Sequence, residues 1–273
     1  MTIFEAIILG LVQSITEFFP ISSSAHLIIL PNILGWEKQS LTFDLVLHFG
    51  TGLALIIFFR NEVKELLSDA YRDFFVNPVK HKKISLTDNS RYSLYLLVGC
   101  IPAVFLGLFF GDYIESSVRD LKLVIVFLIL GTFLMLLAEL KARSKTNFKD
   151  LGFFRAFFIG FFQSFALLPG ISRSGATISG GMLSGLSRFD AGKFAFLMAI
   201  PVTIGPALLK IKDDSYLLSQ YPYEMFSAFL SSFLFGLLAL KLLTIFLKRG
   251  TLIPFIVYRT ILVIFLIIFT STR

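Results

Sequence analysis

The sequence predicts an all-α membrane protein made of two inverted repeats, each a re-entrant helical hairpin followed by three transmembrane helices. Hydrophobic residues make up 56% of the 273 residues and charged residues only 16%, which is too apolar for an ordinary soluble domain. Six apolar stretches are long enough to cross a bilayer, and two further apolar regions are each interrupted in the middle. Those two interrupted regions also match each other in sequence.

The six spanning stretches each hold close to the roughly 20 residues that a helix needs to cross the hydrocarbon core. We therefore expect six transmembrane helices within a single integral membrane domain that covers residues 1–273. The stretches lie at residues 42–59, 92–111, 121–140, 190–209, 224–247 and 252–270.

The two interrupted regions run from Ile3 to Gly35 and from Leu151 to Leu186. Pro20 divides the first and Pro169 with Gly170 divides the second, so that each piece is too short to cross. Helix breakers are tolerated at membrane depth where the freed backbone lines protein or a water-filled cavity. We expect both regions to be re-entrant hairpins that meet inside the bilayer.

The interrupted regions align at one constant offset, as a duplication would produce. Residues 10–14 (GLVQS) and 160–164 (GFFQS) coincide when residues 21–24 (ISSS) are laid over residues 171–174 (ISRS). The copies differ at the positions where chemistry would occur. An acid and a histidine in the first copy align with apolar residues in the second. A serine of the first copy faces an arginine of the second.

Loop charges predict the topology. Lys and Arg are concentrated in residues 60–91 and 141–149, and cytoplasmic loops are those that accumulate basic residues. With both loops inside, the first hairpin enters from the outer face and the second from the cytoplasm. The halves, about 1–145 and 146–273, are then inverted copies, and two similar motifs without inversion are the alternative. The net charge of +7 gives no reason to expect nucleic acid, since no basic run is interleaved with aromatic residues in a soluble module.

Glu17 is the most informative ionisable residue. A charge inside an apolar segment costs roughly 2.5–3.5 kcal/mol on insertion scales, so we expect it to face a cavity and a partner. Gln13 lies four residues earlier and projects from the same helix face. Gln13 is a weaker candidate, because an amide also serves packing and Gln163 occupies its place in the other half. The alternative for Glu17 is a helix-end group that caps the neighbouring serines.

Each break is followed by a serine cluster typical of a helix start, Ser22–Ser24 in the first copy and Ser172–Ser174 in the second. Two helix N-termini that face one cavity would bind an anion through their free N–H groups. Arg173 adds a planar fork of donors suited to phosphate, and Gly175 permits close backbone approach. A structural ion pair between Arg173 and Glu17 is an alternative that is compatible with a site.

His26 follows the first serine cluster and offers nucleophilic or acid-base chemistry, while the serine hydroxyls offer a second kind of nucleophile. His48 and His81 lie outside the two interrupted regions and lack the company of Glu17, Arg173 and the helix starts, and His81 lies in a basic loop, so we assign them no role. Arg259 and Asp44 lie in apolar stretches and are expected to form a structural pair.

Two signatures closely resemble those of the undecaprenyl-diphosphate phosphatase family of the bacitracin-resistance type. They are Q-S-I-T-E-F-F-P-I-S-S-S-A-H at residues 13–26 and P-G-I-S-R-S-G-A-T-I-S-G-G at residues 169–181, and the similarity covers essentially the whole chain. The resemblance implies hydrolysis of undecaprenyl diphosphate to the monophosphate and phosphate in the bacterial plasma membrane. It also implies a site open to the extracytoplasmic side and dependence on a divalent cation, Mg²⁺ or Ca²⁺.

Carried over by resemblance, the catalytic residues are His26, Ser23, Glu17 and Arg173. The substrate-binding residues are Gln13, Ser22, Ser24, Ser172, Ser174, Gly175 and Thr177. Glu17 would also be a ligand of the metal ion, whose other ligands would be diphosphate oxygens and water. Because position 13 carries the neutral amide where the family has glutamate or glutamine, Glu17 is the only carboxylate in the motif.

The competing function is a carrier or flippase for lipid-linked or free phosphate, because inverted repeats with broken helices are also a transporter design. Nucleophilic and proton-handling side chains favour hydrolysis, since transport needs only binding groups. A structural scaffold would leave a buried acid and a buried arginine unexplained. The expected partners are the polyprenyl diphosphate substrate and membrane lipid. The sequence leaves open whether His26 or a serine attacks, and whether the chain forms a homo-oligomer.

Overall fold

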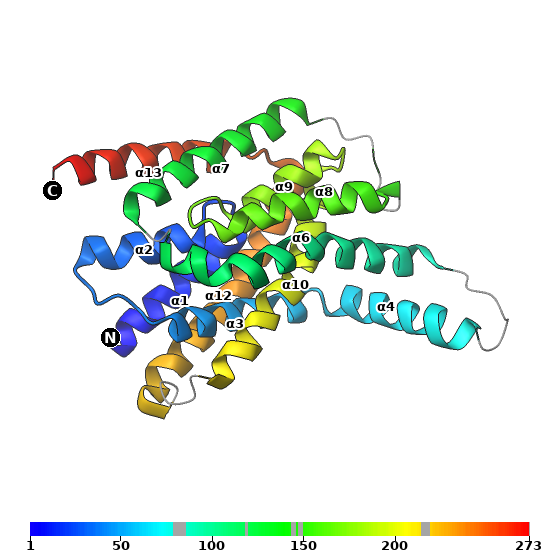
Figure 1. The fold of residues 1–273 in the computed structure, drawn as a ribbon, viewed down its shortest axis with the longest axis horizontal. Helices are drawn as coiled ribbons and strands as arrows, with labels where there is room; N and C mark the ends of the chain where they lie inside the picture. The colour runs from blue at the N-terminus through cyan, green and yellow to red at the C-terminus, as the bar shows by residue number, and fades with distance from the viewer. Residues whose placement is uncertain (79–85, 118–119, 143–145, 147–149, 214–218, 273) are drawn as a thin grey trace.

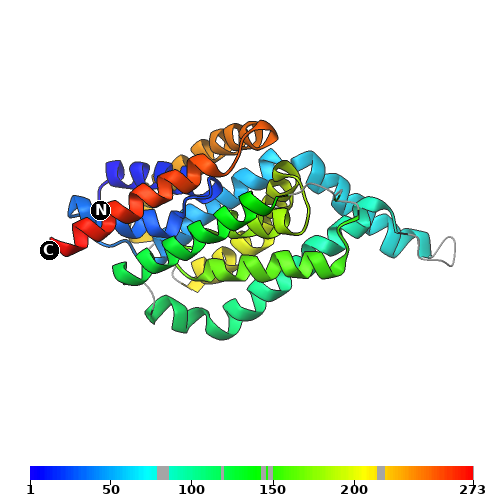
Figure 2. The ribbon, with the colours of Figure 1, turned by 90° about the horizontal axis from the view of Figure 1, so that it is seen from above.

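The computed structural model describes residues 1–273 except 79–85, 118–119, 143–145, 147–149, 214–218 and 273, and every regular element in the described part is helical. Figures 1 and 2 show a bundle of long and short helices. In chain order these are α1 (Ile3–Phe18), α2 (Ser23–Leu34), α3 (Leu41–Phe58), α4 (Arg60–Tyr71), η1 (Arg72–Val76), α6 (Asp88–Ser117), α7 (Leu121–Lys141), α8 (Phe153–Ser164), η3 (Phe165–Leu167), α9 (Arg173–Leu183), α10 (Arg188–Asp213), α12 (Pro222–Arg249) and α13 (Ile253–Ser271).

Six helices are long and apolar enough to cross a membrane, which confirms the six predicted spans. Their apolar faces that point away from the bundle carry many of the exposed Phe, Leu and Ile side chains, as a lipid-facing surface requires. The six segments are Leu41–Phe58, Asp88–Gly111, Leu121–Lys141, Arg188–Leu208, Pro222–Arg249 and Ile253–Ser271.

Residues 60–78 and 88–91 are helical, whereas a loop was expected from their charge. The first part forms α4 and η1, and α6 already begins at Asp88. Figures 1 and 2 both show α4 and the first turns of α6 projecting together away from the bundle. The sequence R-N-E-V-K-E-L-L-S-D-A-Y of α4 is rich in good helix formers, which is why it is helical despite its charge.

The short helices α1 and α8 each pack against a span from the other half of the chain. Helix α1 lies along α12, and α8 lies along α6. Gly10 allows the first contact, because a Cβ there would lie 2.7 Å from the Cβ of Ser231. Gly160, its counterpart 150 residues later, lies directly against the backbone of Gly99. Glycine at both crossings lets the backbones approach as small residues do between membrane helices.

We expect Gly160→Ala to destabilise the fold, because the added methyl group would overlap the Gly99 backbone, which has no room to move. Overpacking of this kind typically costs about 1–3 kcal/mol. The measurement is thermal unfolding of the detergent-purified protein. Gly111→Ala on the same helix as Gly99 is the matched control, since its methyl group would meet nothing within 4 Å. Equal unfolding temperatures for the two variants would contradict the tight crossing.

Candidate active site

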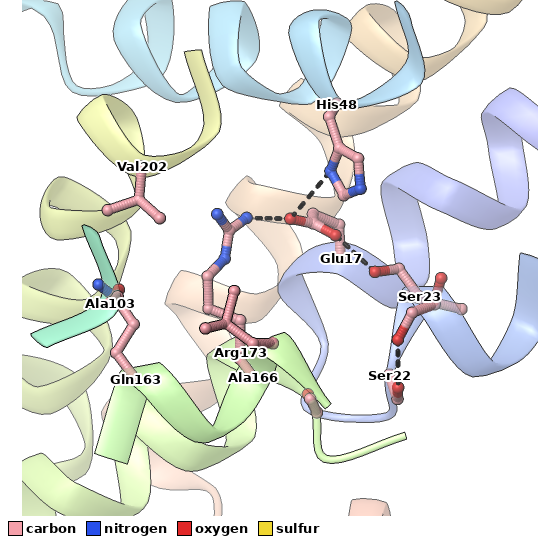
Figure 3. Close-up of a pocket in the computed structure, with 13 residues that line it drawn as sticks. Glu17, Ser22, Ser23, His48, Ala103, Gln163, Ala166, Arg173 and Val202 are labelled. Atoms are coloured by element: carbon pink, nitrogen blue, oxygen red, sulfur yellow. Dashed lines mark hydrogen bonds and ion pairs between the residues drawn. The ribbon is translucent and has the colours of Figure 1, made fainter. Parts of the chain in front are cut away.

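A cavity of about 190 Å³ lies where the two broken regions meet in the middle of the bundle. Figure 3 shows Glu17, Ser23 and His48 on one side of it, and Val202, Ala103 and Gln163 on the other. It is lined by Thr16, Glu17, Ser22, Ser23, Ser24, His48, Ala103, Gln163, Ala166, Leu167, Ser172, Arg173 and Val202. Segments separated by about 150 residues in the sequence therefore contribute to one cavity.

Both breaks have the same local structure. After each break the helix begins with a serine N-cap, Ser22 for α2 and Ser172 for α9, as the sequence predicts. The two serines have φ of +76°, and among the described residues they are the only non-glycine residues with positive φ. This region is sterically costly for a residue with a Cβ, and such strain persists where the surrounding structure enforces it, often at functional sites.

Each serine N-cap makes the same pair of side-chain contacts. The Ser22 hydroxyl accepts a hydrogen bond from the Ala25 N–H and lies 3.2 Å from the Ser24 hydroxyl. In the second copy the Ser172 hydroxyl accepts from the Gly175 N–H and lies 3.2 Å from the Ser174 hydroxyl. Two helix N-termini, each with a cluster of hydroxyl groups, thus begin beside one cavity, which is the arrangement that binds anions.

Glu17 and Arg173 form an ion pair that joins the two broken regions. The Arg173 Nη2 donates to Glu17 Oε1 (Figure 3). Its Nη1 donates to the Thr203 hydroxyl on α10. The Glu17 side chain is 4% exposed and that of Arg173 is 18% exposed. The structural ion pair expected as an alternative is therefore present, and it forms one wall of the cavity. Loss of one partner would leave the other charge buried and uncompensated, which is strongly unfavourable.

Ser23 is held against the same carboxylate. Its hydroxyl donates to Glu17 Oε2 at 2.6 Å, a short distance typical of a charge-assisted hydrogen bond. The carboxylate therefore has Arg173 on one oxygen and Ser23 on the other. A hydroxyl bonded to a carboxylate, facing a cavity and close to a guanidinium, can act as a nucleophile whose proton passes to the carboxylate.

His48 belongs to the site, although the sequence analysis assigned it no role. Its Nδ1 lies 3.0 Å from the Gln13 amide nitrogen and 3.6 Å from Glu17 Oε1, and its ring lines the cavity. Helix α3 places it there by packing beside α1. That expectation was wrong because it drew the polar cluster only from the two broken regions, whereas His48 comes from α3. The rule that singled out Glu17, an ionisable group inside an apolar segment, applies equally to His48.

His26 does not line the cavity, contrary to the expected convergence with Arg173. Its Nδ1 lies 2.7 Å from the Ser22 carbonyl oxygen, and its Nε2 lies 2.7 Å from the Tyr258 hydroxyl on α13. A carbonyl can only accept, so Nδ1 carries the proton and a neutral ring has Nε2 as acceptor for the Tyr258 O–H. Both ring nitrogens are therefore engaged in this structure. The physical reason is that the first turn of α2 directs His26 towards α13.

The other predicted residues divide into two groups. Ser24 and Ser172 line the cavity together with Ser22 and Ser23, whereas Gln13, Ser174, Gly175 and Thr177 lie behind it. Those behind it support the lining. The Thr177 hydroxyl donates to the Arg173 carbonyl at 2.8 Å, and a Cβ on Gly175 would lie 3.2 Å from the Ser172 hydroxyl. The Ser174 hydroxyl lies within 3.4 Å of the Phe19 carbonyl across the two breaks.

Gln163 is a second lining residue to which the sequence assigned only packing. It is 1% exposed, and neither atom of its amide has a hydrogen-bond partner among the described residues. Buried polar atoms are nearly always paired in folded proteins. An amide without partners beside Arg173 and the cavity is therefore available to a polar ligand or a water molecule. Its place opposite Gln13 in the repeat was the signal that could have identified it.

The described residues contain no group of three or more His, Cys, Asp and Glu side chains that could hold a metal ion by themselves. Glu17 is the carboxylate on the cavity. The Gln13 Oε1 is buried and has no hydrogen-bond partner in the described part of the chain. The Gln13 amide nitrogen, not this oxygen, faces Glu17 and donates to Oε2 at 3.2 Å. Glu17 is thus the lining residue that suits a hard cation, which would take its other ligands from a phosphate group and water, the usual mode for Mg²⁺.

The fold defines a helical, multi-pass membrane protein with a polar cavity where two broken helical regions meet. The comparisons with known proteins agree with this class. The family model for the bacitracin resistance protein BacA matches residues 6–265, and the chain belongs to this family. The resemblance found in the two signatures is thereby confirmed.

Similar proteins have been named in several bacteria. Undecaprenyl-diphosphatase of Idiomarina loihiensis is 38% identical over 269 residues, covering 97% of this chain and 98% of that protein. Undecaprenyl-diphosphatase 1 of Pseudoalteromonas translucida is 36% identical over 276 residues, covering 99% and 100%. Undecaprenyl-diphosphatase of Pelobacter propionicus is 36% identical over 264 residues, covering 96% and 94%. The similarity therefore extends over the full length on both sides.

Proposed function

We propose that this protein hydrolyses undecaprenyl diphosphate to undecaprenyl phosphate and inorganic phosphate. The reaction recycles the lipid carrier for bacterial cell-wall synthesis and confers resistance to bacitracin. The observation that carries the proposal is the contact of Ser23 and Arg173 with the two oxygens of one buried carboxylate, Glu17, at a cavity between two helix starts. Full-length similarity to proteins named undecaprenyl-diphosphatase supports the same substrate.

In the bilayer, we infer two inverted repeats with re-entrant hairpins α1–α2 and α8–α9. The support is the matching serine N-caps and the matching contacts of α1 with α12 and of α8 with α6. The basic segments at residues 60–91 and 141–149 are cytoplasmic by the positive-inside rule, within a bacterial plasma membrane. The cavity then opens towards the extracytoplasmic side, where the diphosphate head group enters while the prenyl tail stays in lipid.

The reaction is a phosphoryl transfer in which positioning and charge compensation supply most of the catalysis. The Ser23 oxygen attacks the terminal phosphorus while its proton passes to Glu17. The bond from that phosphorus to the bridging oxygen breaks, and undecaprenyl phosphate leaves with the bridging oxygen. Water then cleaves the phosphoserine and releases phosphate. Arg173 and the N-termini of α2 and α9 bind the phosphoryl oxygens throughout.

Ser23 is favoured over His26 as the nucleophile because the serine hydroxyl lines the cavity and is bonded to a carboxylate. Both nitrogens of the His26 ring are already engaged, by the Ser22 carbonyl and the Tyr258 hydroxyl. His48, at 3.6 Å from Glu17, is placed to exchange a proton with the carboxylate as the phosphoserine is hydrolysed.

A divalent cation fits this donor set when the diphosphate is also bound. Glu17, the carboxylate on the cavity, would hold it. Such an ion would compensate part of the negative charge of the diphosphate. The chain's own cation for that purpose is Arg173, which already lies at the cavity.

We expect Arg173→Ala to lower the rate of phosphate release by roughly 10²–10³-fold, because it removes donors that bind charge developing in the transition state. Arg173→Lys should recover part of the loss, since it restores the charge without the planar fork. The measurement is phosphate release from undecaprenyl diphosphate by purified protein. Inorganic diphosphate should raise the unfolding temperature of wild type and not of Arg173→Ala.

Arg155→Ala is the matched control for Arg173, because Arg155 is exposed on α8 and, within the described part of the chain, bonds only the Thr146 hydroxyl. Near wild-type turnover in folded Arg173→Ala would remove this arginine from the site. Protein-dependent movement of lipid in liposomes without phosphate release would instead point to the carrier.

We expect Ser23→Ala to lose at least about 10³-fold in rate, in line with the loss of a nucleophile in other hydrolases. A single turnover of wild type, stopped in acid, should trap an acid-stable phosphoserine at Ser23. Ser174→Ala, which removes a hydroxyl behind the cavity lining, is the control and should still be labelled. An acid-labile adduct at His26 would identify the histidine as the nucleophile and overturn this mechanism.

Removal of divalent cations with EDTA should abolish phosphate release, and Mg²⁺ or Ca²⁺ should restore it. Glu17→Gln should raise the cation concentration needed for any remaining activity, because it replaces the carboxylate ligand by a weaker amide. The measurement is a titration of the initial rate against free cation. Full activity in EDTA would show that Arg173 and the helix N-termini suffice.

A further inference from the structure

Helix α13 reaches both broken regions through two consecutive residues. The Tyr258 hydroxyl lies 2.7 Å from His26 Nε2 in α2, and the two rings are stacked with centroids 5.8 Å apart. The Arg259 Nη2 lies 2.9 Å from the carbonyl oxygen of Gly170, in the turn before α9. One helix from the end of the chain therefore contacts the segment that carries Ser23 and the segment that carries Arg173.

Arg259 is buried without an acidic partner, and a contribution to fold stability does not explain that burial. It is 0% exposed, and its partners in the described chain are neutral: the Gly170 and Leu128 carbonyls and the Thr132 hydroxyl. No ion pair joins it to Asp44 within the described residues, so the pair expected from the sequence is wrong. Its Nη1 has no hydrogen-bond partner among those residues. A buried charge without a carboxylate is costly, so a role beyond fold stability should account for it.

Hydrogen bonds hold the backbone of Gly170 on both sides. Its carbonyl accepts from Arg259, and its N–H donates to the Ser24 hydroxyl of the other broken region at 3.3 Å. Gly170 has φ of +113°, and a Cβ there would lie 2.7 Å from the Val124 carbonyl on α7. The turn that leads into Ser172 and Arg173 is therefore fixed by an arginine of α13 and a serine of α2.

The Tyr258 contact extends to the first helix start. Tyr258 donates to His26 Nε2, and His26 Nδ1 donates to the Ser22 carbonyl at 2.7 Å. Ser22 is the strained N-cap of α2, and the next residue is Ser23. A continuous chain of hydrogen bonds thus runs from α13 to the peptide unit that carries the proposed nucleophile.

We propose that Tyr258 and Arg259 are positioning residues that act through His26 and Gly170 to hold Ser23 and Arg173 in register at the diphosphate. The proposal rests on the proposed phosphatase function. It assigns His26 a structural part in the site, as the link between Tyr258 and Ser22. Reacting groups displaced by about 1 Å can lose on the order of 10²-fold in rate, so modest loosening should appear in catalysis before it appears in stability.

The test uses purified wild type and variants Tyr258→Phe, Arg259→Lys and Arg259→Met, with phosphate release measured over a range of undecaprenyl diphosphate concentrations. Tyr258→Phe keeps the stacked ring and removes only the donor, and Tyr258 is 42% exposed, so the variant should fold. We expect its kcat to fall roughly five- to tenfold at nearly unchanged KM, as for loss of one positioning hydrogen bond. Arg259→Met should lose at least about 10²-fold in kcat, and Arg259→Lys should recover part of that loss.

Two controls separate positioning from folding. Tyr223→Phe and Arg249→Lys make the same chemical changes at exposed positions of α12 and should leave kcat unchanged. Rates are expressed per folded molecule from the amplitude of thermal unfolding. A purely structural role would lower that amplitude in proportion to the rate, leaving kcat per folded molecule as in wild type.

A double-mutant cycle tests the route through His26. His26→Asn keeps a donor near the Nδ1 position for the Ser22 carbonyl and removes the atom that accepts from Tyr258. We expect it to resemble Tyr258→Phe, and the double variant to be no slower than either single one, because both remove the same contact. Complete loss in His26→Asn beside a mild effect of Tyr258→Phe would overturn the proposal, since His26 would then act directly.

Wild-type kcat in both folded Tyr258→Phe and folded Arg259→Lys would also overturn the proposal. So would a raised KM at unchanged kcat, because that result would indicate direct contact with the substrate. Absence of phosphate release from wild type would be a different result, because it would refute the phosphatase function and the positioning role with it.

Discussion

The ion pair between Glu17 and Arg173 is the interaction on which the rest of the site depends. It joins two segments 156 residues apart in sequence, and both charges lie inside a bundle whose outer surface is apolar. Neither charge would be acceptable there alone, since a buried charge without a partner is expensive. Pairing solves that problem and at the same time places a carboxylate and a guanidinium at one cavity. The requirement for a stable fold and the requirement for a phosphate site are therefore met by the same contact.

The two breaks supply a region favourable to anions, which the neutral ion pair by itself does not. Ser22 and Ser172 adopt the same strained backbone conformation, which turns each chain sharply enough for a new helix to begin beside the cavity. Helix starts present unpaired N–H groups, so two of them create a region favourable to anions although the Glu17–Arg173 pair itself carries no net charge. The strain is maintained by contacts between the breaks, such as the Gly170 N–H to the Ser24 hydroxyl.

The two copies share a backbone design and divide the chemistry between them. The first copy carries Ser23 after its break, where the second copy carries Arg173. The first copy also carries Glu17 one turn before its break, where the second copy has an apolar residue. In the proposed mechanism the nucleophile and the proton acceptor thus come from one copy and the phosphate-binding cation from the other. Catalysis of this kind needs both copies, because neither contains the complete set. His48 on α3 and the pair Tyr258–Arg259 on α13 then complete the site from outside the two breaks.

The sequence by itself determined the helical class, the six spans, both breaks with their serine N-caps, and the candidacy of Glu17, Ser23 and Arg173. These features depend on local composition, helix length and backbone preference, all of which are readable along the chain. Only the tertiary structure decided that His48 and Gln163 line the cavity, that His26 turns to Tyr258, and that Arg259 binds Gly170 instead of Asp44. Those outcomes depend on which helices pack side by side and which face each presents, and sequence separations of up to 232 residues carry no local signal of such contacts.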